Sequence, residues 1–132
     1  MQVTDFSDAS SLLRLGEAGR NEFKIRLAST QEVEVHRLDD YSRLHGLPTP
    51  DLIKLDVQGY ELRVLEGAEA LLPSVRAVLT EVSFRSYYDG QVLFPELLHF
   101  LENRGFHLHA FDTTTALGRP LTQTNVLFLR AT

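Results

Sequence analysis

The sequence predicts an α/β fold, in which parallel strands alternate with crossover helices and an antiparallel hairpin closes the sheet. Between residues 51 and 105 the spacing of apolar residues changes twice from strand-like to helix-like. Two further strand-like segments follow with no helical segment between them. The 132 residues contain no repeat and no long linker, so we expect one domain over residues 1–132.

The N-terminal part carries weaker signals. Residues 8–15 predict a short helix that begins at Asp8 or Ser10 and ends at Gly16. Apolar and charged residues then alternate over residues 23–27 and again over 32–38. This is the period of half-buried strands, so we expect two peripheral strands there.

The centre of the chain predicts a buried strand at 51–57 that leads directly into a helix. Leu52, Ile53, Leu55 and Val57 form a compact apolar run within that strand. After Gly59, apolar residues recur at helical spacing until Pro73.

The same pair of elements recurs in the next segment. Residues 77–84 predict a second strand, and the helix that follows has Pro95 in its first turn and Gly105 past its end. Strands joined by helices favour parallel neighbours with right-handed connections. Residues 107–112 and 125–131 are separated only by a polar loop, so they should pair antiparallel at the sheet edge.

Composition excludes several classes of function. The net charge of -5 gives no positive field for nucleic acid or anionic membranes. No apolar run is long enough to span a bilayer, and the N-terminus lacks a signal-peptide pattern. Without cysteine there are no disulfides and no thiolate sites. We therefore expect a cytoplasmic protein with neither a nucleic-acid nor a membrane partner.

Three segments together resemble the signature of FkbM-family methyltransferases. They are LDDY at 38–41, DLIKLDVQGYELRVLEGAEALL at 51–72 and VLTEVSF at 78–84. The resemblance covers roughly residues 38–130, and SSLL at 10–13 is a fainter match. It implies the C-terminal half of a class I, Rossmann-like methyltransferase that uses S-adenosylmethionine, with 51–57 as fourth strand and 77–84 as fifth.

The resemblance also implies that the first two strands of the family fold are missing. In that fold a glycine-rich turn after the first strand holds the cofactor. Gly16, Gly19 and Gly46 are the only glycines before residue 50, and none follows a buried strand in such a turn. We expect an incomplete cofactor site. A sheet cut there exposes the edge of strand 51–57, unless 23–27 and 32–38 fold back over it. The exposed edge predicts a homo-oligomer or a complementing N-terminal polypeptide.

The candidate catalytic residues are Asp56, Lys54 and Glu81. Asp56 ends a parallel strand, where α/β sheets bind ligands, and could orient a small-molecule acceptor or take its hydroxyl proton. Its alternative role is a helix cap. Lys54 lies on the same strand face as Asp56 and could neutralise its charge, or its side chain could extend to solvent. Glu81 lies within an apolar strand and needs a partner, in an acidic crevice with Asp56 or in a structural ion pair.

The turn after this strand supplies the candidate cofactor-binding residues Asp56, Val57 and Gly59. The family pattern has an acid before the glycine, whereas this chain has Gln58. An amide retains hydrogen bonding but loses proton transfer and strong metal binding. No metal is expected, because the histidines lack helical ligand spacing, although His107 and His109 share a strand face.

Other residues have a structural and a functional interpretation. The position of Glu61 in the first turn of its helix favours a structural role, because negative charge is stabilising there. Phe84, Tyr87 and Tyr88 follow the second strand and could cover an acceptor or cap the core. The sequence leaves two functions open: O-methylation of a hydroxyl on a sugar or secondary metabolite, and a non-catalytic interaction module.

Overall fold

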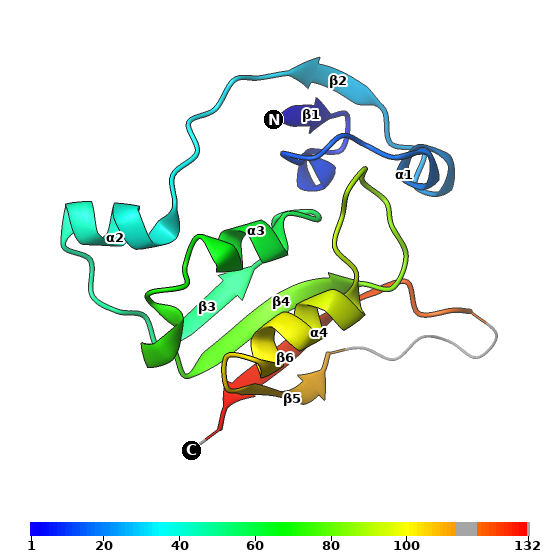
Figure 1. Cartoon of the computed structure of the whole chain (residues 1–132). Helices are drawn as coiled ribbons and strands as arrows, with labels where there is room; N and C mark the ends of the chain where they lie inside the picture. The colour runs from blue at the N-terminus through cyan, green and yellow to red at the C-terminus, as the bar shows by residue number, and fades with distance from the viewer. Residues whose placement is uncertain (113–118, 132) are drawn as a thin grey trace.

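A four-stranded sheet with the order β3-β4-β6-β5 forms the centre of the molecule (Figure 1). The structure, a computed structural model, describes residues 1–112 and 119–131. β4 runs parallel to β3 and antiparallel to β6, and β6 runs antiparallel to β5. The predicted parallel pair and closing hairpin are confirmed, and β6 lies between β4 and β5. The strands are β3 (Leu52–Leu55), β4 (Ala77–Ser83), β5 (Phe106–Phe111) and β6 (Gln123–Arg130).

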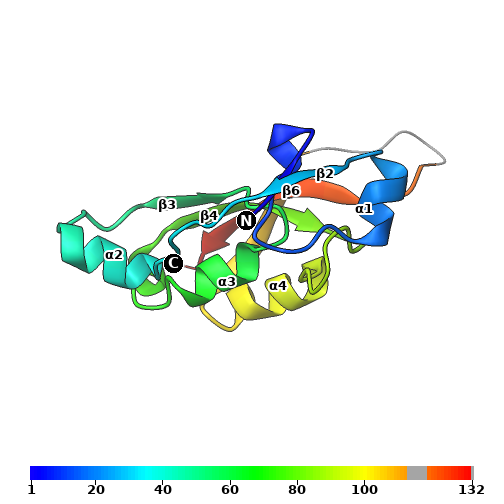
Figure 2. The ribbon, with the colours of Figure 1, turned by 90° about the horizontal axis from the view of Figure 1, so that it is seen from above.

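Two helices cover one face of this sheet, as Figure 2 shows from above. They are α3 (Glu61–Glu66) and α4 (Phe94–Glu102), and the main core lies between them and the strands. Alternate strand residues such as Ile53, Val78 and Phe128 point toward the helices and are almost fully buried. The opposite face carries no helix from the described part of the chain, and Leu52 on that face is 51% exposed.

The helix expected from Gly59 to Pro73 is shorter than predicted. α3 ends at Glu66, and Pro73 lies in a separate 3-10 turn, η2 (Leu72–Ser74). The cause is a side chain from elsewhere: Asp39 accepts the backbone N–H groups of Ala70 and Leu71 at 3.1 and 3.2 Å. These contacts stabilise a turn where the helix would otherwise continue.

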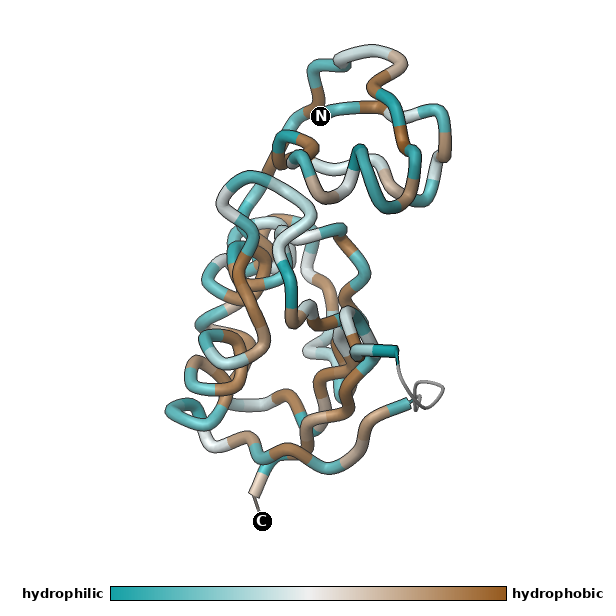
Figure 3. Tube along the Cα trace, turned by 90° about the vertical axis from the view of Figure 1, so that its right-hand side faces the viewer, coloured by the Kyte–Doolittle hydropathy of each residue, from teal (hydrophilic) through white to brown (hydrophobic). Residues whose placement is uncertain are grey.

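The N-terminal residues form a small lobe beyond the carboxyl ends of β3 and β4 (Figures 1 and 3). β1 (Gln2–Thr4) pairs antiparallel with β2 (Leu27–Thr30), and between them lie a 3-10 turn, η1 (Ser7–Ala9), and α1 (Glu17–Glu22). The helix expected at 8–15 was wrong. Ser11 pairs with Gln2 and Leu15 with Tyr88, and these bridges hold the segment extended. Gly16 precedes α1 and ends no helix.

The strands expected at 23–27 and 32–38 were also largely wrong. Lys24 has a φ of 56°, which interrupts an extended run, and β2 begins only at Leu27. Residues 31–37 form neither helix nor strand, and α2 (Leu38–His45) follows with two acidic residues in its first turn. Because β2 pairs with β1, neither segment pairs with β3. The outer edge of β3 has no strand beside it among the described residues.

Candidate functional site

Asp56 and Lys54 lie together at the carboxyl end of β3. Asp56 directly follows Leu55, the last residue of the strand. The Lys54 Nζ lies 3.8 Å from Asp56 Oδ2, and the two side chains are 61% and 50% exposed. Alternation along the strand places both on the face that no helix covers. The pair is therefore within reach of a ligand at the strand end.

The turn after Asp56 is held by a buried glutamate. Glu61 Oε1 accepts the backbone N–H groups of Val57 and Gly59, both at 3.2 Å. Burial raises the pKa of Glu61, these hydrogen bonds oppose the rise, and the nearby charge of Asp56 adds to it. The carboxylate thus replaces the solvent that the two N–H groups would otherwise need. Both groups are occupied within the chain.

Glu81 lies at the same level on the neighbouring strand. Leu55 pairs with Thr80 in the parallel register, so the next pair along would place Asp56 beside Glu81. Burial raises the pKa of Glu81 to about 7, with further contributions from Asp56 and Glu61, and Lys54 opposes the rise. Gln123 Nε2 donates to its carboxylate at 3.5 Å. The structure therefore gathers Lys54, Asp56 and Glu81 at one end of the sheet.

A row of uncharged polar groups continues from Glu81. Ser83 Oγ accepts hydrogen bonds from the amides of Gln91 at 2.8 Å and Gln123 at 3.1 Å. Gln91 Oε1 in turn accepts the backbone N–H groups of Tyr87 and Tyr88. The loop after β4 is therefore fixed to the strand end. No pattern in the sequence points to these glutamines, because an amide has no spacing or charge that marks it.

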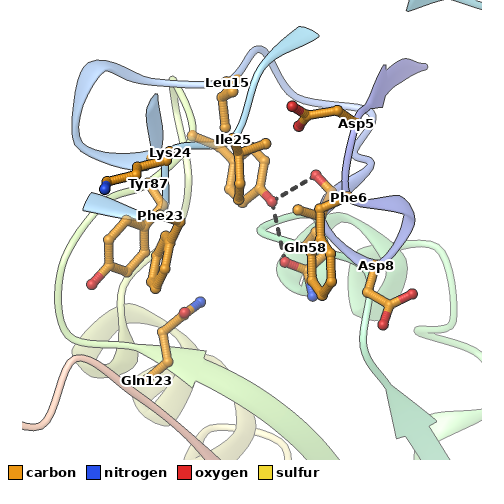
Figure 4. Close-up of a pocket in the computed structure, with 13 residues that line it drawn as sticks. Asp5, Phe6, Asp8, Leu15, Phe23, Lys24, Ile25, Gln58, Tyr87 and Gln123 are labelled. Atoms are coloured by element: carbon orange, nitrogen blue, oxygen red, sulfur yellow. Dashed lines mark hydrogen bonds between the residues drawn. The ribbon is translucent and has the colours of Figure 1, made fainter. Parts of the chain in front are cut away.

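A pocket of about 520 Å³ opens between these strand ends and the N-terminal lobe. Figure 4 shows Phe6 and Gln58 on one side of it, Phe23 and Tyr87 on the other, and Gln123 below. Most of its remaining lining comes from the N-terminal lobe, which sequence patterns assigned only to peripheral elements. The lining residues are Asp5, Phe6, Asp8, Ala9, Leu15, Gly19, Phe23, Lys24, Ile25, Gln58, Tyr87, Tyr88 and Gln123.

Two of the three predicted catalytic residues, Asp56 and Glu81, contact side chains that line this pocket. Asp56 accepts a hydrogen bond from the Gln58 amide at 3.0 Å, and Glu81 contacts Gln123. Gln58 and Gln123 both line the pocket, whereas Lys54, Asp56 and Glu81 do not. The acidic groups therefore lie one side chain behind the pocket wall.

The aromatic residues of the loop after β4 were expected either to cover an acceptor or to cap the core, and they differ in which they do. Tyr87 and Tyr88 are 2% and 3% exposed and pack around Leu15, so they close a small core of their own while lining the pocket. Phe84 instead contacts Phe94, with ring centroids 5.2 Å apart, and lies outside the pocket. Only the two tyrosines are placed to meet a ligand.

Two structural observations bear on metals and membranes. Within residues 1–112 and 119–131, no three histidine, aspartate or glutamate side chains are grouped so as to hold a metal ion. His107 and His109 lie on β5, whose pairing with β6 is irregular between Leu108 and Ala110. None of the helices in the described ranges is long and apolar enough to cross a membrane.

Comparisons with known proteins agree with the motifs and the sheet. The model of the methyltransferase FkbM domain matches residues 2–108, so the match begins earlier and ends earlier than the motifs indicated. The chain is 35% identical over 95 residues to a protein of Sinorhizobium fredii (strain NBRC 101917 / NGR234) named 2-O-methyltransferase NoeI. That match covers 71% of this chain and 39% of the relative, and no solved structure matches. The chain belongs to the FkbM methyltransferase family.

Proposed function

We propose that this chain provides the acceptor side of an S-adenosylmethionine-dependent O-methyltransferase. Its substrate would carry a hydroxyl group, on a sugar or a secondary metabolite. The family and the name of the 2-O-methyltransferase relative support the transferase class. The main support for the proposal is the position of Glu81 beside Asp56 at the ends of two parallel strands. The pKa of the Glu81 carboxyl there is raised to about 7.

Methylation of a hydroxyl oxygen requires a group that accepts a proton near neutral pH. When a hydroxyl oxygen is alkylated, its O–H bond breaks and the proton must pass to a base. A carboxylate with a pKa of about 7 is a stronger base than an ordinary glutamate, and half of it is ionised at that pH. Glu81 would accept the proton, and the charge of Asp56 would orient the hydroxyl.

The pocket fits the acceptor in this proposal. Its aromatic walls, from Phe6, Phe23 and the two tyrosines, offer apolar surface to a ring or chain. Gln58 and Gln123 offer amide groups that can bind hydroxyls, and each also contacts one of the two carboxylates. An acceptor bound there would reach Asp56 and Glu81 where its hydroxyl takes the place of the Gln58 or Gln123 amide at the carboxylate.

The described residues do not by themselves form a complete cofactor site. The N–H groups of Val57 and Gly59 donate to Glu61, and none of the described glycines forms a glycine-rich turn after a buried strand. Asp56 is the one predicted cofactor contact whose polar group faces outward. S-adenosylmethionine would supply the methyl group in this proposal.

A complementing polypeptide, or another part of a longer native chain, would supply the remainder. β3 and β4 would be the fourth and fifth strands of a Rossmann-like sheet, which their parallel pairing and the antiparallel β6 beside β4 support. The unpartnered edge of β3 and the uncovered sheet face are where the other strands and helices would pack. The chain spans about two fifths of the length of its curated relative, which leaves room for that part.

Calorimetric titration with S-adenosylhomocysteine tests the proposal. We expect no binding by the chain alone and binding after it is mixed with a polypeptide encoded just upstream. Transfer to a hydroxyl acceptor should then fall at least tenfold in Glu81→Gln and stay unchanged in Glu102→Gln, an exposed acid on α4. Binding by the lone chain would refute the complementing partner. No binding in either case would refute the transferase and favour a non-catalytic interaction module.

A further inference from the structure

The Asp56 carboxylate is held at both of its oxygens. Gln58 Nε2 donates to Oδ1 at 3.0 Å, and Lys54 Nζ lies 3.8 Å from Oδ2. A half-exposed aspartate with one free oxygen could rotate among several orientations. Partners on both oxygens favour one orientation. The Lys54 side chain is 61% exposed and its contact is the longer of the two, so the closer contact to Asp56 is the Gln58 amide.

Asp56 and Tyr88 contact the two ends of that amide and together set its orientation. An ionised carboxylate only accepts hydrogen bonds, so the NH₂ end of Gln58 must face Asp56 and the carbonyl end must face away. Gln58 Oε1 lies 3.1 Å from the Tyr88 hydroxyl, which also donates to the Ala9 carbonyl at 2.9 Å. Burial raises the pKa of Tyr88 to about 12, so the hydroxyl keeps its proton at neutral pH. Its one hydrogen is shared between the two acceptors.

The backbone of Gln58 is held in place as well. Its φ of 51° lies in the left-handed region, which a glutamine seldom adopts. Ser11 Oγ donates to the Gln58 carbonyl at 2.7 Å and ties this turn to the N-terminal lobe. The lobe thus contacts Gln58 directly through Ser11 and indirectly through Ala9 and Tyr88. The side chain and the backbone of one residue are fixed by independent contacts.

We propose that Gln58 and Tyr88 are positioning residues that orient the Asp56 carboxylate, and that they connect the pocket and the N-terminal lobe to it. The inference rests on the proposed function, in which Asp56 orients the acceptor hydroxyl. Both residues line the pocket, so an acceptor that contacts them also acts on the orientation of Asp56. This arrangement gives the amide of Gln58 a specific role. A carboxylate there would repel Asp56, whereas the amide donates to it.

Nuclear magnetic resonance of the side-chain amide tests the geometry without any measurement of activity. In the wild-type chain we expect a high order parameter for the Gln58 NH₂ group, comparable to that of the backbone. Tyr88→Phe, which removes one hydroxyl, should lower it clearly, and Asp56→Asn should shift the amide signal. Tyr87→Phe is the matched control, because that hydroxyl contacts Glu22 and not Gln58. A Gln58 amide that is equally mobile in wild type and Tyr88→Phe would overturn the inference.

Kinetics of the complemented enzyme test the consequence for transfer. Gln58→Leu, which removes the amide, and Tyr88→Phe should each lower kcat by about tenfold while KM for the methyl donor changes little. If transfer occurs and kcat is unchanged in both variants, the positioning role is refuted while the proposed function stands. If no transfer occurs but the amide is ordered as described, the proposed function fails and the hydrogen-bonded geometry stands.

Discussion

At the scale of single residues, Glu81 combines a functional advantage with a structural cost. Burial and the charges of Asp56 and Glu61 disfavour its ionised form, so its pKa rises to about 7 in the folded chain from 4.5. The folded state therefore binds its proton more tightly than the unfolded state does. Below the lower value both states are protonated and stability carries no penalty. As pH rises from 4.5 to about 7, stability is lost.

Glu81→Gln should remove this loss. At pH 8 the free energy of unfolding of the variant should exceed that of wild type by on the order of 1–2 kcal/mol, once solvent screening of a half-buried group is allowed for. The variant should therefore unfold at a higher denaturant concentration. At pH 4 the two proteins should differ little. Denaturant titrations at both pH values measure this. A variant that is less stable than wild type at pH 8 would show that the carboxylate is paired rather than destabilised.

Burial raises the pKa of Glu61 as well, but its carboxylate also accepts hydrogen bonds that hold the turn itself. Glu61→Ala leaves the N–H groups of Val57 and Gly59 without their acceptor in a buried turn, which should cost about 1–3 kcal/mol. Glu66→Ala is the comparison, since that carboxylate only pairs with Arg63 at the surface. Equal losses of thermal stability in the two variants would contradict the structural role of Glu61.

The sequence predicted the two carboxylates of the candidate site but not the glutamines that contact them. Asp56 and Glu81 interrupt apolar runs, and a charge in such a run is visible without a structure. Gln58, Gln91 and Gln123 hold those carboxylates and the loop after β4, but glutamine occurs in any surface segment, so their role depends on distances that spacing does not encode.

At the scale of elements, the turn between β3 and α3 depends on Gly59. Its φ is 94°, and an added Cβ would lie 3.1 Å from both Gln91 Cγ and Leu13 Cδ1. Gly59→Ala should therefore suffer backbone strain of about 1–2 kcal/mol and, in addition, about 1 kcal/mol or more from displaced neighbours. Chemical denaturation measures the sum.

Gly90→Ala separates the two contributions. Gly90 also has a positive φ, 74°, yet an added Cβ there would meet nothing within 4 Å. It should show the backbone strain alone, so the difference between the two variants reports packing of the turn against the lobe and the loop. Equal destabilisation would mean that Gln91 and Leu13 move aside without cost.

The elements that sequence patterns predicted well are those whose burial is set by their own periodicity. The strands at 52–55 and 77–83, and α4, bury every second residue or one helical stripe in the main core. Residues 8–15 and 32–38 have similar local signals but lie outside it. Their conformations follow from contacts with distant residues, such as Leu15 with Tyr88 and Arg37 with the Glu66 carbonyl. Local propensity cannot anticipate such contacts.

At the scale of the whole molecule, helices of the described residues cover the sheet on one side only. β3 and β4 are parallel, and parallel strands are ordinarily covered on both faces. The uncovered face instead presents four leucines from three strands, which line two open pockets: Leu52, Leu79, Leu127 and Leu129. No strand among the described residues pairs with the outer edge of β3.

This surface predicts that the purified chain associates with itself when the complementing polypeptide is absent. Sedimentation equilibrium at micromolar concentrations should give a mass above that of the monomer. Leu52→Lys places a charge at the open edge and on the uncovered face, and should return the chain to a monomer. Leu44→Lys, at a 79% exposed leucine of α2 outside the sheet, should leave the association unchanged. A wild-type chain that sediments as a compact monomer would mean that this edge needs no partner, and the complementing polypeptide would lose its main structural support.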